Sequence, residues 1–249
     1  MISSRLINGF RKINVQLNER FFKAEANTYC YYLAWLDQYV LPAGMIIDLG
    51  AGSVSLETYL PRAGDNSIRL VAVDSHYNGL ANNRTRLKVV ANAGALPFRD
   101  ETVDVVTASC FFEHMADPAA IISECHRVLK KRGALVFYTP HRRSYVAAIA
   151  RITPLSFHRL VRTLQTGQSS DEVEVCETFY KMNTHSDIVR YVERFRIVSL
   201  QTYIGAPCYT TFLPPPVHLA FVMFSKILQR VNYLRRNFGE SIIGCLVKP

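Results

Sequence analysis

Short apolar runs alternate with helix-like segments along most of the chain. This alternation is typical of βαβ units, in which helices cover a mostly parallel sheet. A helical region is expected up to about Val40, and a short helix is expected over residues 53–60, where Pro61 would stop it. The apolar runs predict seven strands, at residues 45–49, 69–74, 87–91, 103–109, 134–139, 196–203 and 241–247.

Two further predicted helices have readable ends. One has Asp117 as its N-cap and Pro118 in its first turn, and Gly133 would close it. Residues 130–132, which are Lys, Lys and Arg, would complement the dipole at its C-terminus. The other is expected over residues 184–192 and begins with a capping arrangement.

The net charge of +9 is unevenly distributed. Residues 126–170 contain nine Lys or Arg and no Asp or Glu, so the rest of the chain is neutral. Such a stretch can attract nucleic acid, anionic lipid or a phosphorylated substrate, or it can be a solvated helix end followed by a basic loop. Residues 140–183 and 205–238 are expected as insertions on the sheet, and both are rich in aromatic, aliphatic and basic residues.

The N-terminal residues lack the apolar core of a signal peptide. Their apolar and basic residues predict an amphipathic helix that resembles an organelle transit peptide, whereas Glu19 and Glu25 argue against one. The longest apolar stretch, residues 217–228, falls short of the ~18 residues that a membrane span needs. The six cysteines are scattered, which fits a reducing compartment. A cytoplasmic protein is therefore predicted, with peripheral membrane contact left open.

Residues 45–52 read Met-Ile-Ile-Asp-Leu-Gly-Ala-Gly, a buried strand followed by a glycine turn. Two closely spaced glycines allow the backbone to approach a ligand without an intervening Cβ. In open α/β sheets, ligands bind outside the carboxyl ends of the strands. The turn is therefore a candidate cofactor loop, and dinucleotide-binding and methyl-donor-binding folds share it.

Two details favour a methyl donor. Ser55 stands where the dinucleotide fingerprint needs a third small residue, Gly or Ala. Asp48, immediately before the turn, would repel a pyrophosphate but suits a cofactor that carries an ammonium and a sulfonium cation. Asp74, at the end of the next strand, is placed to accept hydrogen bonds from ribose hydroxyls in either fold.

Six short motifs occur in the order seen in class I S-adenosylmethionine-dependent methyltransferases, and the chain resembles that family over roughly residues 45–140. They are Ile-Ile-Asp-Leu-Gly-Ala-Gly (46–52), Val-Ala-Val-Asp (71–74), Ala-Asn-Ala-Gly-Ala-Leu-Pro-Phe (91–98), Val-Asp-Val-Val (103–106), Phe-Glu-His (112–114) and Arg-Val-Leu-Lys (127–130). The resemblance is to the type 11 methyltransferases, in the branch that includes the ubiquinone and menaquinone C-methyltransferases.

The resemblance implies a Rossmann-like α/β fold, with helices on both faces of a seven-stranded, mostly parallel sheet whose last strand is antiparallel. Residues 1–249 would form a single methyltransferase domain, with a helical cap at 1–44, a cofactor-binding core at 45–140 and substrate-side insertions at 140–183 and 205–238. The cofactor would be S-adenosylmethionine, and S-adenosylhomocysteine would be the product.

The resemblance also implies a cofactor site. Its residues would be Asp48, Gly50, Ala51 and Gly52 at the methionine end, Asp74 at the ribose, Ser75 and His76 near the adenine, Asn92 and Ala93 at the adenine edge, and Ser109 and Cys110 beneath the methionine moiety. No metal site is predicted.

The sequence departs from the family pattern at two positions of that site. Val54 stands where many relatives have a third glycine, and Asn92 replaces the usual Asp. An amide can still accept a hydrogen bond from the adenine amino group. A working enzyme is therefore favoured, and a non-catalytic S-adenosylmethionine-binding relative is the alternative.

Catalytic residues are harder to identify, because methyl transfer from a sulfonium depends mainly on positioning and on the exclusion of water. A base would help where the acceptor is a hydroxyl or an acidic carbon. His114, beyond the fourth strand, and His141, beyond the fifth, are the candidates, and each can instead be a structural residue.

The acceptor must be inferred from the insertions. Residues 141–164 and 212–231 combine apolar and basic side chains, which favours a small-molecule, lipid-like or glycan-linked acceptor met at a membrane surface, or else an ordinary lid. The competing class is an RNA or other nucleic-acid methyltransferase. Enzymes that methylate base amino groups usually carry Asn/Asp-Pro-Pro-aromatic after the fourth strand, whereas residues 109–114 read Ser-Cys-Phe-Phe-Glu-His. Nucleic acid is therefore disfavoured, and the acceptor and the oligomeric state stay open.

Overall fold

The computed structural model describes residues 4–22, 27–152 and 177–249. The chain divides into two compact units. The sheet unit comprises residues 29–140, 178–201 and 242–249, and the helical unit comprises residues 1–28, 141–177 and 202–241. Residues 153–176 of the insertion predicted at 140–183 lie outside the described residues.

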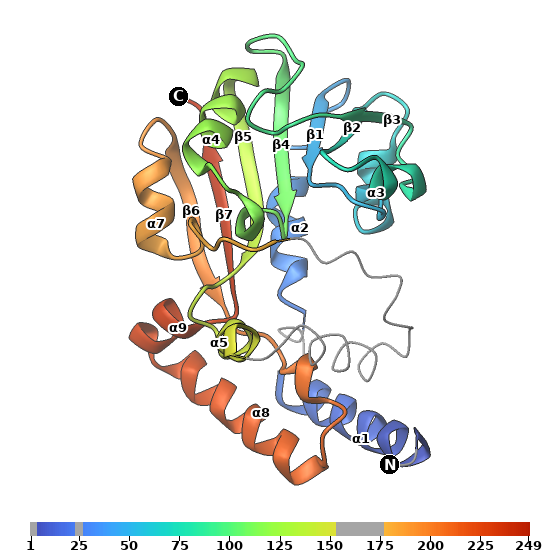
Figure 1. The fold of residues 1–249 in the computed structure, drawn as a ribbon, viewed down its shortest axis with the longest axis vertical. Helices are drawn as coiled ribbons and strands as arrows, with labels where there is room; N and C mark the ends of the chain where they lie inside the picture. The colour runs from blue at the N-terminus through green and yellow to red at the C-terminus, as the bar shows by residue number, and fades with distance from the viewer. Residues whose placement is uncertain (1–3, 23–26, 153–176) are drawn as a thin grey trace. The chain divides into compact units, whose positions relative to one another are not determined.

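Seven strands form one sheet in the order β3-β2-β1-β4-β5-β7-β6 (Figure 1). Strands β1 to β5 pair as parallel neighbours, and β7 is antiparallel to β5. The predicted α/β architecture is confirmed. The strands are β1 (Met45–Leu49), β2 (Arg69–Asp74), β3 (Leu87–Val90), β4 (Val103–Ser109), β5 (Leu129–Pro140), β6 (Arg196–Tyr203) and β7 (Ser241–Val247).

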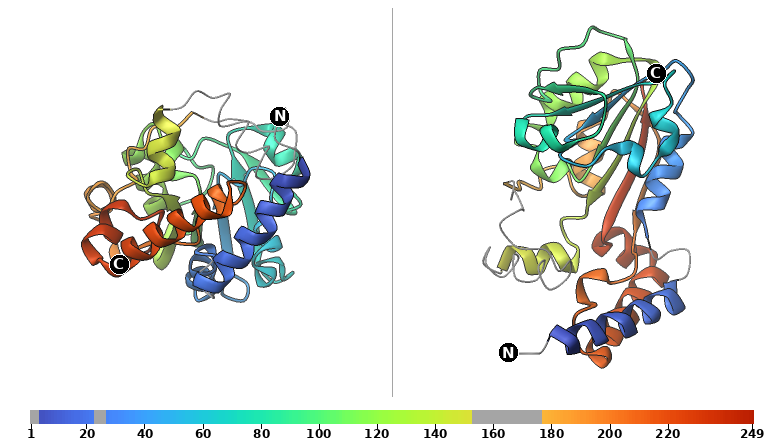
Figure 2. Two further views of the ribbon diagram at one scale, coloured as in Figure 1. Left: turned by 90° about the horizontal axis from the view of Figure 1, so that it is seen from below. Right: turned by 90° about the vertical axis from the view of Figure 1, so that its right-hand side faces the viewer.

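The central strands are buried on both faces. In β1 and β4, side chains pointing to either side of the sheet are inaccessible to solvent, as continuous apolar runs predict. Helix α2 (Tyr29–Asp37) lies against one face, and α4 (Pro118–Val128) and α7 (His185–Tyr191) lie against the other (Figure 2). The short helix α3 (Tyr77–Asn82) follows β2.

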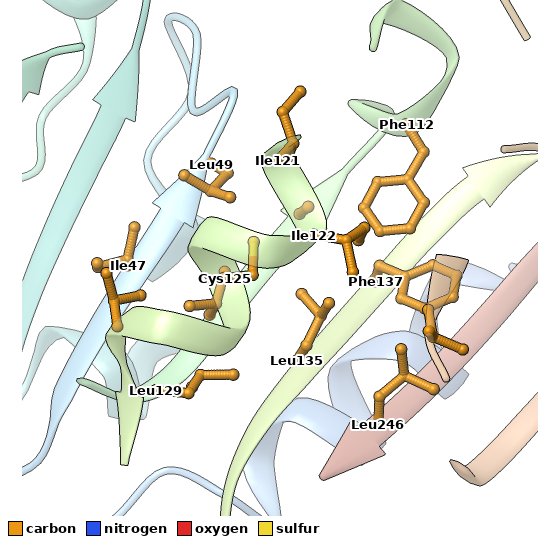
Figure 3. Packing of buried hydrophobic residues seen from close by; sticks show 14 of the residues in the cluster. Ile47, Leu49, Phe112, Ile121, Ile122, Cys125, Leu129, Leu135, Phe137 and Leu246 are labelled. Carbon is orange, nitrogen blue, oxygen red and sulfur yellow. The ribbon is translucent and has the colours of Figure 1, made fainter. Parts of the chain in front are cut away.

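The core of the sheet unit forms between α4 and the central strands. Ile122 and Cys125 of α4 point towards Leu135 and Phe137 of β5 (Figure 3). Phe137 also stacks on Phe112, with ring centroids 4.4 Å apart. These contacts fix the strand ends at which the predicted site residues lie.

Two predicted N-caps are confirmed. At the start of α4, the Asp117 carboxylate accepts a hydrogen bond from the backbone N–H of Ala120 at 3.1 Å. At the start of α7, the Thr184 hydroxyl accepts one from the N–H of Asp187 at 3.2 Å. Each bond satisfies an amide that the helix itself leaves without a partner.

The predicted end of the helix after Asp117 is wrong. Helix α4 ends at Val128, and residues 129–140 form β5, so the three basic residues lie in a strand. The Lys130 ammonium lies 2.8 and 2.9 Å from the two carboxylate oxygens of Asp104 on β4. Gly133 is no C-cap either, because it lies inside β5. A Cβ there would lie 2.9 Å from the Lys130 carbonyl oxygen. Strand pairing and an ion pair therefore override the helix-ending signal.

The short helix predicted over residues 53–60 is also wrong. This segment contains a single 3₁₀ turn, Leu56–Thr58, and a second 3₁₀ turn follows at Pro61–Gly64. The backbone carbonyl of Gly52 accepts a hydrogen bond from the Asn83 side chain at 3.0 Å, and so does not start a helical ladder. A side chain distant in sequence thus replaces the expected local structure.

The helical unit contains the N-terminal helix, the helix that follows β5 in the chain and the two helices between β6 and β7. They are α1 (Ser4–Phe22), α5 (Tyr145–Ile152), α8 (Pro215–Arg230) and α9 (Asn232–Phe238), together with a 3₁₀ turn at Cys208–Thr210. Helices α1 and α8 pack together through a small buried cluster that includes Phe22 and Val222. The unit contains parts of the predicted cap at 1–44 and of the predicted insertions at 140–183 and 205–238. That the whole chain acts as a single methyltransferase domain stays a prediction.

Candidate cofactor site

The glycine turn after β1 has the backbone geometry that its sequence predicts. Gly50 and Gly52 have φ values of +67° and +51°, a region that favours glycine. A Cβ on Gly50 would lie 2.6 Å from Cδ2 of Phe111, so only glycine fits there. A Cβ on Gly52 would meet no described atom within 4 Å. The turn is therefore packed on the Gly50 side and open on the Gly52 side.

Asp74 joins this turn to the end of β2. One carboxylate oxygen accepts a hydrogen bond from the Gly52 N–H at 3.0 Å, and the other accepts one from the His76 N–H at 2.9 Å. The Ser75 hydroxyl in turn lies 3.0 Å from Nδ1 of His76. Because each carboxylate oxygen has a further lone pair, Asp74 can still accept hydrogen bonds from a diol.

Asn83 holds the turn from outside the predicted motif. Its amide group donates to the Gly52 carbonyl at 3.0 Å, and its carbonyl accepts from the Ser55 hydroxyl at 3.0 Å. Both side chains are buried. Ser55, which marked a missing small residue in the sequence, is thus a structural support of the loop. Sequence reasoning missed Asn83, because nothing local links it to a turn thirty-one residues earlier.

The turn also gathers acidic side chains. Asp48 is buried near the end of β1, and its carboxyl pKa is raised to about 7, mainly by burial and in addition by the charges of Glu57 and Asp74. The Thr85 hydroxyl donates a hydrogen bond to Glu57 at 3.1 Å, which fixes the second carboxylate. A buried carboxyl beside two other acids is an unfavourable arrangement until a cation joins it. Glu57 was also missed, because it lies in the segment expected to form a short helix and no motif marks it.

Tyrosine rings lie beside this acid. The Tyr29 ring centroid lies 5.0 Å from that of Tyr32 and 5.4 Å from those of Tyr59 and Tyr138. Burial raises the pKa of Tyr29 to about 12; its hydrogen bond to Ser109 acts in the opposite direction, and the charge of Asp48 adds to the rise. Tyr32 is fully buried, and its hydroxyl is hydrogen-bonded to the Thr107 hydroxyl. Aromatic faces attract cations, so the cluster supports the charge preference of the acids.

The other predicted cofactor residues lie at the same edge of the sheet. Ser109 ends β4, and Cys110 follows with φ of +51°, while its N–H donates to the Tyr138 carbonyl at 2.8 Å. After β3, the Asn92 side-chain carbonyl accepts from the Gly94 N–H at 2.8 Å. Ala93 packs against the core. Parallel pairing of β1 with β2 and β4, and of β2 with β3, brings all eleven residues to adjacent strand ends.

Val54 does not need to be glycine. Among the described residues with positive φ it is absent, and its side chain is exposed. A glycine at this position would therefore supply no conformation that valine lacks. The departure from the family pattern therefore imposes no positive-φ strain at Val54.

The two candidate bases lie in different units. His114 ends a 3₁₀ turn after β4, and its Nε2 lies 4.0 Å from the buried Glu113 carboxylate. Burial raises the pKa of Glu113, whose other oxygen accepts from the Thr139 hydroxyl at 3.2 Å. His141, in the helical unit, is buried, and its Nδ1 accepts from the Arg143 N–H at 3.0 Å as α5 begins. His114 therefore lies beside an acid, and His141 accepts a backbone hydrogen bond in the turn before α5. A catalytic role stays a prediction for both.

Comparison with known proteins finds similar sequences over the segment that carries this site. Residues 47–137 match the methyltransferase domain family. A probable S-adenosylmethionine-dependent methyltransferase of Mycobacterium tuberculosis is 37% identical over 95 residues, which cover 36% of this chain and 34% of that protein. The demethylmenaquinone methyltransferase of Thermotoga maritima is 32% identical, with coverages of 36% and 41%.

Solved structures with the same fold cover more of the chain. A putative methyltransferase of Haloferax volcanii, in complex with an activator, has a TM-score of 0.55 at 18% identity, with coverages of 96% of this chain and 97% of that one. Geranyl diphosphate C-methyltransferase of Streptomyces coelicolor has a TM-score of 0.54 at 13% identity, with coverages of 89% and 79%.

The fold is therefore that of the class I methyltransferases, as predicted, and residues 47–137 match a methyltransferase domain, over which a similar protein is named as a probable S-adenosylmethionine-dependent methyltransferase. The chain spans about a third of the length of the first curated relatives that it matches.

Proposed function

We propose that this chain transfers a methyl group from S-adenosylmethionine to a small-molecule, lipid-like acceptor. The observation that carries the proposal is the buried Asp48 carboxyl, which feels the charges of Glu57 and Asp74 near an open glycine turn. Three acids grouped around one turn favour a ligand with positive charge. S-adenosylmethionine carries an ammonium and a sulfonium, and the domain that matches residues 47–137 is a methyltransferase domain.

Each residue of the site has a proposed part in holding the cofactor. Asp48, Gly50, Ala51 and Gly52 would contact the methionine end, and Asp74 would accept hydrogen bonds from the ribose hydroxyls. The other contacts would be Ser75, His76, Asn92 and Ala93 around the adenine, and Ser109 and Cys110 beneath the methionine moiety.

The chemistry follows from charge and enclosure. When bound, the cofactor would supply an electrophilic methyl group on a sulfonium, so that an acceptor could bond to the methyl carbon in line while the carbon–sulfur bond breaks and S-adenosylhomocysteine leaves as a neutral thioether. The chain contributes by fixing the cofactor at Asp48 and Asp74 and by excluding water with the rings around Tyr29. His114 would take a proton from an acidic acceptor, with Glu113 stabilising its protonated form. His141 is kept as the second candidate base.

The acceptor class rests on two observations. Relatives are named for demethylmenaquinone and geranyl diphosphate, both of which carry apolar isoprenoid chains. The helical unit of this chain combines basic residues with exposed apolar side chains. Both favour a lipid-like or anionic small molecule over nucleic acid. We also infer a cytoplasmic location with peripheral membrane contact.

Titration calorimetry with S-adenosylmethionine and S-adenosylhomocysteine tests the cofactor. Binding is expected for the wild type, with a loss of at least about tenfold for Asp74→Asn, since two loop hydrogen bonds and the ribose contacts depend on that carboxylate. The matched control is Asp37→Asn, an acid on α2 whose exposed pairing with Arg62 lies outside the site. Absence of binding by the wild type would overturn the proposal.

Transfer of labelled methyl tests the acceptor. The wild type, incubated with labelled cofactor and either demethylmenaquinol, geranyl diphosphate or total RNA, is expected to label an apolar acceptor. Label in RNA would overturn the acceptor class. Cofactor binding without label in any of these three acceptors would favour the non-catalytic alternative. Loss of turnover in His114→Ala, with cofactor binding unchanged, is expected if His114 is the base.

A further inference from the structure

Helix α8 turns an apolar face away from the helical unit. Its outward residues have between 36% and 57% of their surface exposed, and on a helix they fall on one side. They are Val217, Leu219, Met223, Phe224 and Ile227. Val231, at the C-terminus of the helix, is also exposed. A contiguous exposed apolar face of this kind marks an interaction surface.

The inward face of α8 carries polar residues beside the apolar Val222 and Leu228. His218 and Ser225 are fully buried. Nε2 of His218 lies 3.0 Å from the side-chain oxygen of Asn18 on α1, and Nδ1 lies 2.8 Å from the Thr210 hydroxyl. These bonds can form only when His218 points inward, so they fix the rotation of α8 about its axis. Buried hydrogen bonds thus hold the apolar face outward, against the tendency of the hydrophobic effect to bury it.

The same region is strongly basic. By its boundaries, the helical unit contains fourteen Lys or Arg and seven Asp or Glu, a net charge of +7, whereas the sheet unit has +2. Residues 205–239 contain no acidic residue. Lys226 is turned towards α1, with its ammonium 4.3 Å from the Phe22 ring centroid. Arg230, Arg235 and Arg236 are exposed at the end of α8 and on α9.

We propose that the outward face of α8 docks on the surface of an anionic lipid bilayer. Apolar side chains would enter the boundary between headgroups and acyl chains, and the arginines would contact lipid phosphates. Among the described residues, no helix is long and apolar enough to cross a membrane, which leaves contact with the surface. This inference rests on the proposed function, because docking would give the enzyme access to a lipid-like acceptor in the bilayer.

Sedimentation with vesicles tests the docking. The full chain is mixed with vesicles of phosphatidylcholine alone, or of phosphatidylcholine with phosphatidylglycerol, at moderate salt. Binding to the anionic vesicles is expected to be at least about tenfold tighter and to weaken at high salt. The double variant Met223→Ser/Ile227→Ser is expected to lose at least about tenfold in affinity, since it removes two of the exposed apolar anchors.

The matched control is Val90→Ser/Val189→Ser, which removes two exposed apolar residues from the sheet unit. It should bind vesicles like the wild type, and neither double variant should lower the unfolding temperature, because all four side chains are exposed. Equal binding by the two double variants would overturn the proposal. A change of oligomeric state in Met223→Ser/Ile227→Ser, without vesicle binding by the wild type, would assign the face to a second copy instead. Cofactor binding, measured separately by calorimetry, distinguishes failure of the docking from failure of the proposed function.

Discussion

Asp48→Asn should stabilise the cofactor-free protein while removing its affinity for the cofactor. In the folded chain the Asp48 carboxyl is buried, and Glu57 and Asp74 add unfavourable charge around it. Asparagine keeps the shape of the side chain and removes the charge. The residue would thus be retained for binding at the expense of stability.

The size of the effect follows from the pKa. Burial raises the pKa of Asp48 from 3.8 to about 7, so between these values the folded state binds more protons than the unfolded state. Stability therefore falls as the pH rises from about 4, and the loss is complete above about pH 7. A shift of this size corresponds to about 4 kcal/mol at pH 8, and to less than about 2 kcal/mol at pH 5. Because the buried amide also needs hydrogen-bond partners, we expect Asp48→Asn to gain about 2–4 kcal/mol at pH 8.

The assay is urea unfolding of the wild type and Asp48→Asn at pH 8 and pH 5, with titration of S-adenosylhomocysteine and S-adenosylmethionine into both. Glu193→Gln, at an exposed acid of the sheet unit, controls for the loss of one negative charge. A gain for Asp48→Asn that is larger at pH 8 than at pH 5, together with weaker binding of S-adenosylmethionine, is expected. A variant that is less stable at both pH values, or that binds the cofactor like the wild type, would refute the reasoning.

Three further predictions concern the same turn. A cationic ligand lowers the pKa of Asp48, so the dissociation constant should rise by up to about tenfold per pH unit below pH 7 and stay flat above it, in calorimetry across pH 5–9. Asn83→Ala should lose about 1–3 kcal/mol of stability in urea unfolding and weaken cofactor binding, since the Gly52 carbonyl and the Ser55 hydroxyl lose a partner, whereas the exposed Asn82→Ala should do neither. In thermal unfolding, Gly50→Ala should be clearly destabilising, because its φ is +67° and a Cβ would lie 2.6 Å from a neighbouring ring, whereas Gly9→Ala, in α1 with open space around it, should gain about 0.5–1 kcal/mol. An equal effect of both glycine substitutions would contradict the role of backbone strain.

The strands and the glycine turn could be predicted because short-range patterns specify them. A buried parallel strand is a continuous apolar run, and the bounds of β1, β2, β4, β6 and β7 match the predicted ones. Positive φ at Gly50 and Gly52 follows from residue type at a tight turn. The sequence also determined that Asp74 ends the strand beside this turn.

Errors arose where a distant residue supplied the partner. The end of α4 was misplaced because the Lys130 ammonium pairs with Asp104 across the sheet instead of facing the helix dipole. The helix predicted over residues 53–60 does not form, and there the Gly52 carbonyl accepts a hydrogen bond from the Asn83 side chain. In both cases the observed structure follows a tertiary contact and not the local helix signal, because local preferences are weak.

For the chemistry of the site, too, some features could be predicted from the sequence and others depend on the tertiary structure. The sequence by itself determined that an acid and two glycines meet at a strand end, which favours a cationic cofactor over a pyrophosphate. Only the tertiary structure decided that Asp48 is buried and that Glu57 and Tyr29 lie near it. It also decided which face of α8 points outward, since that depends on buried hydrogen bonds from His218 to Asn18 and Thr210. Burial and the closeness of charges depend on residues that are far apart in the chain. They arise only when folding brings those residues together.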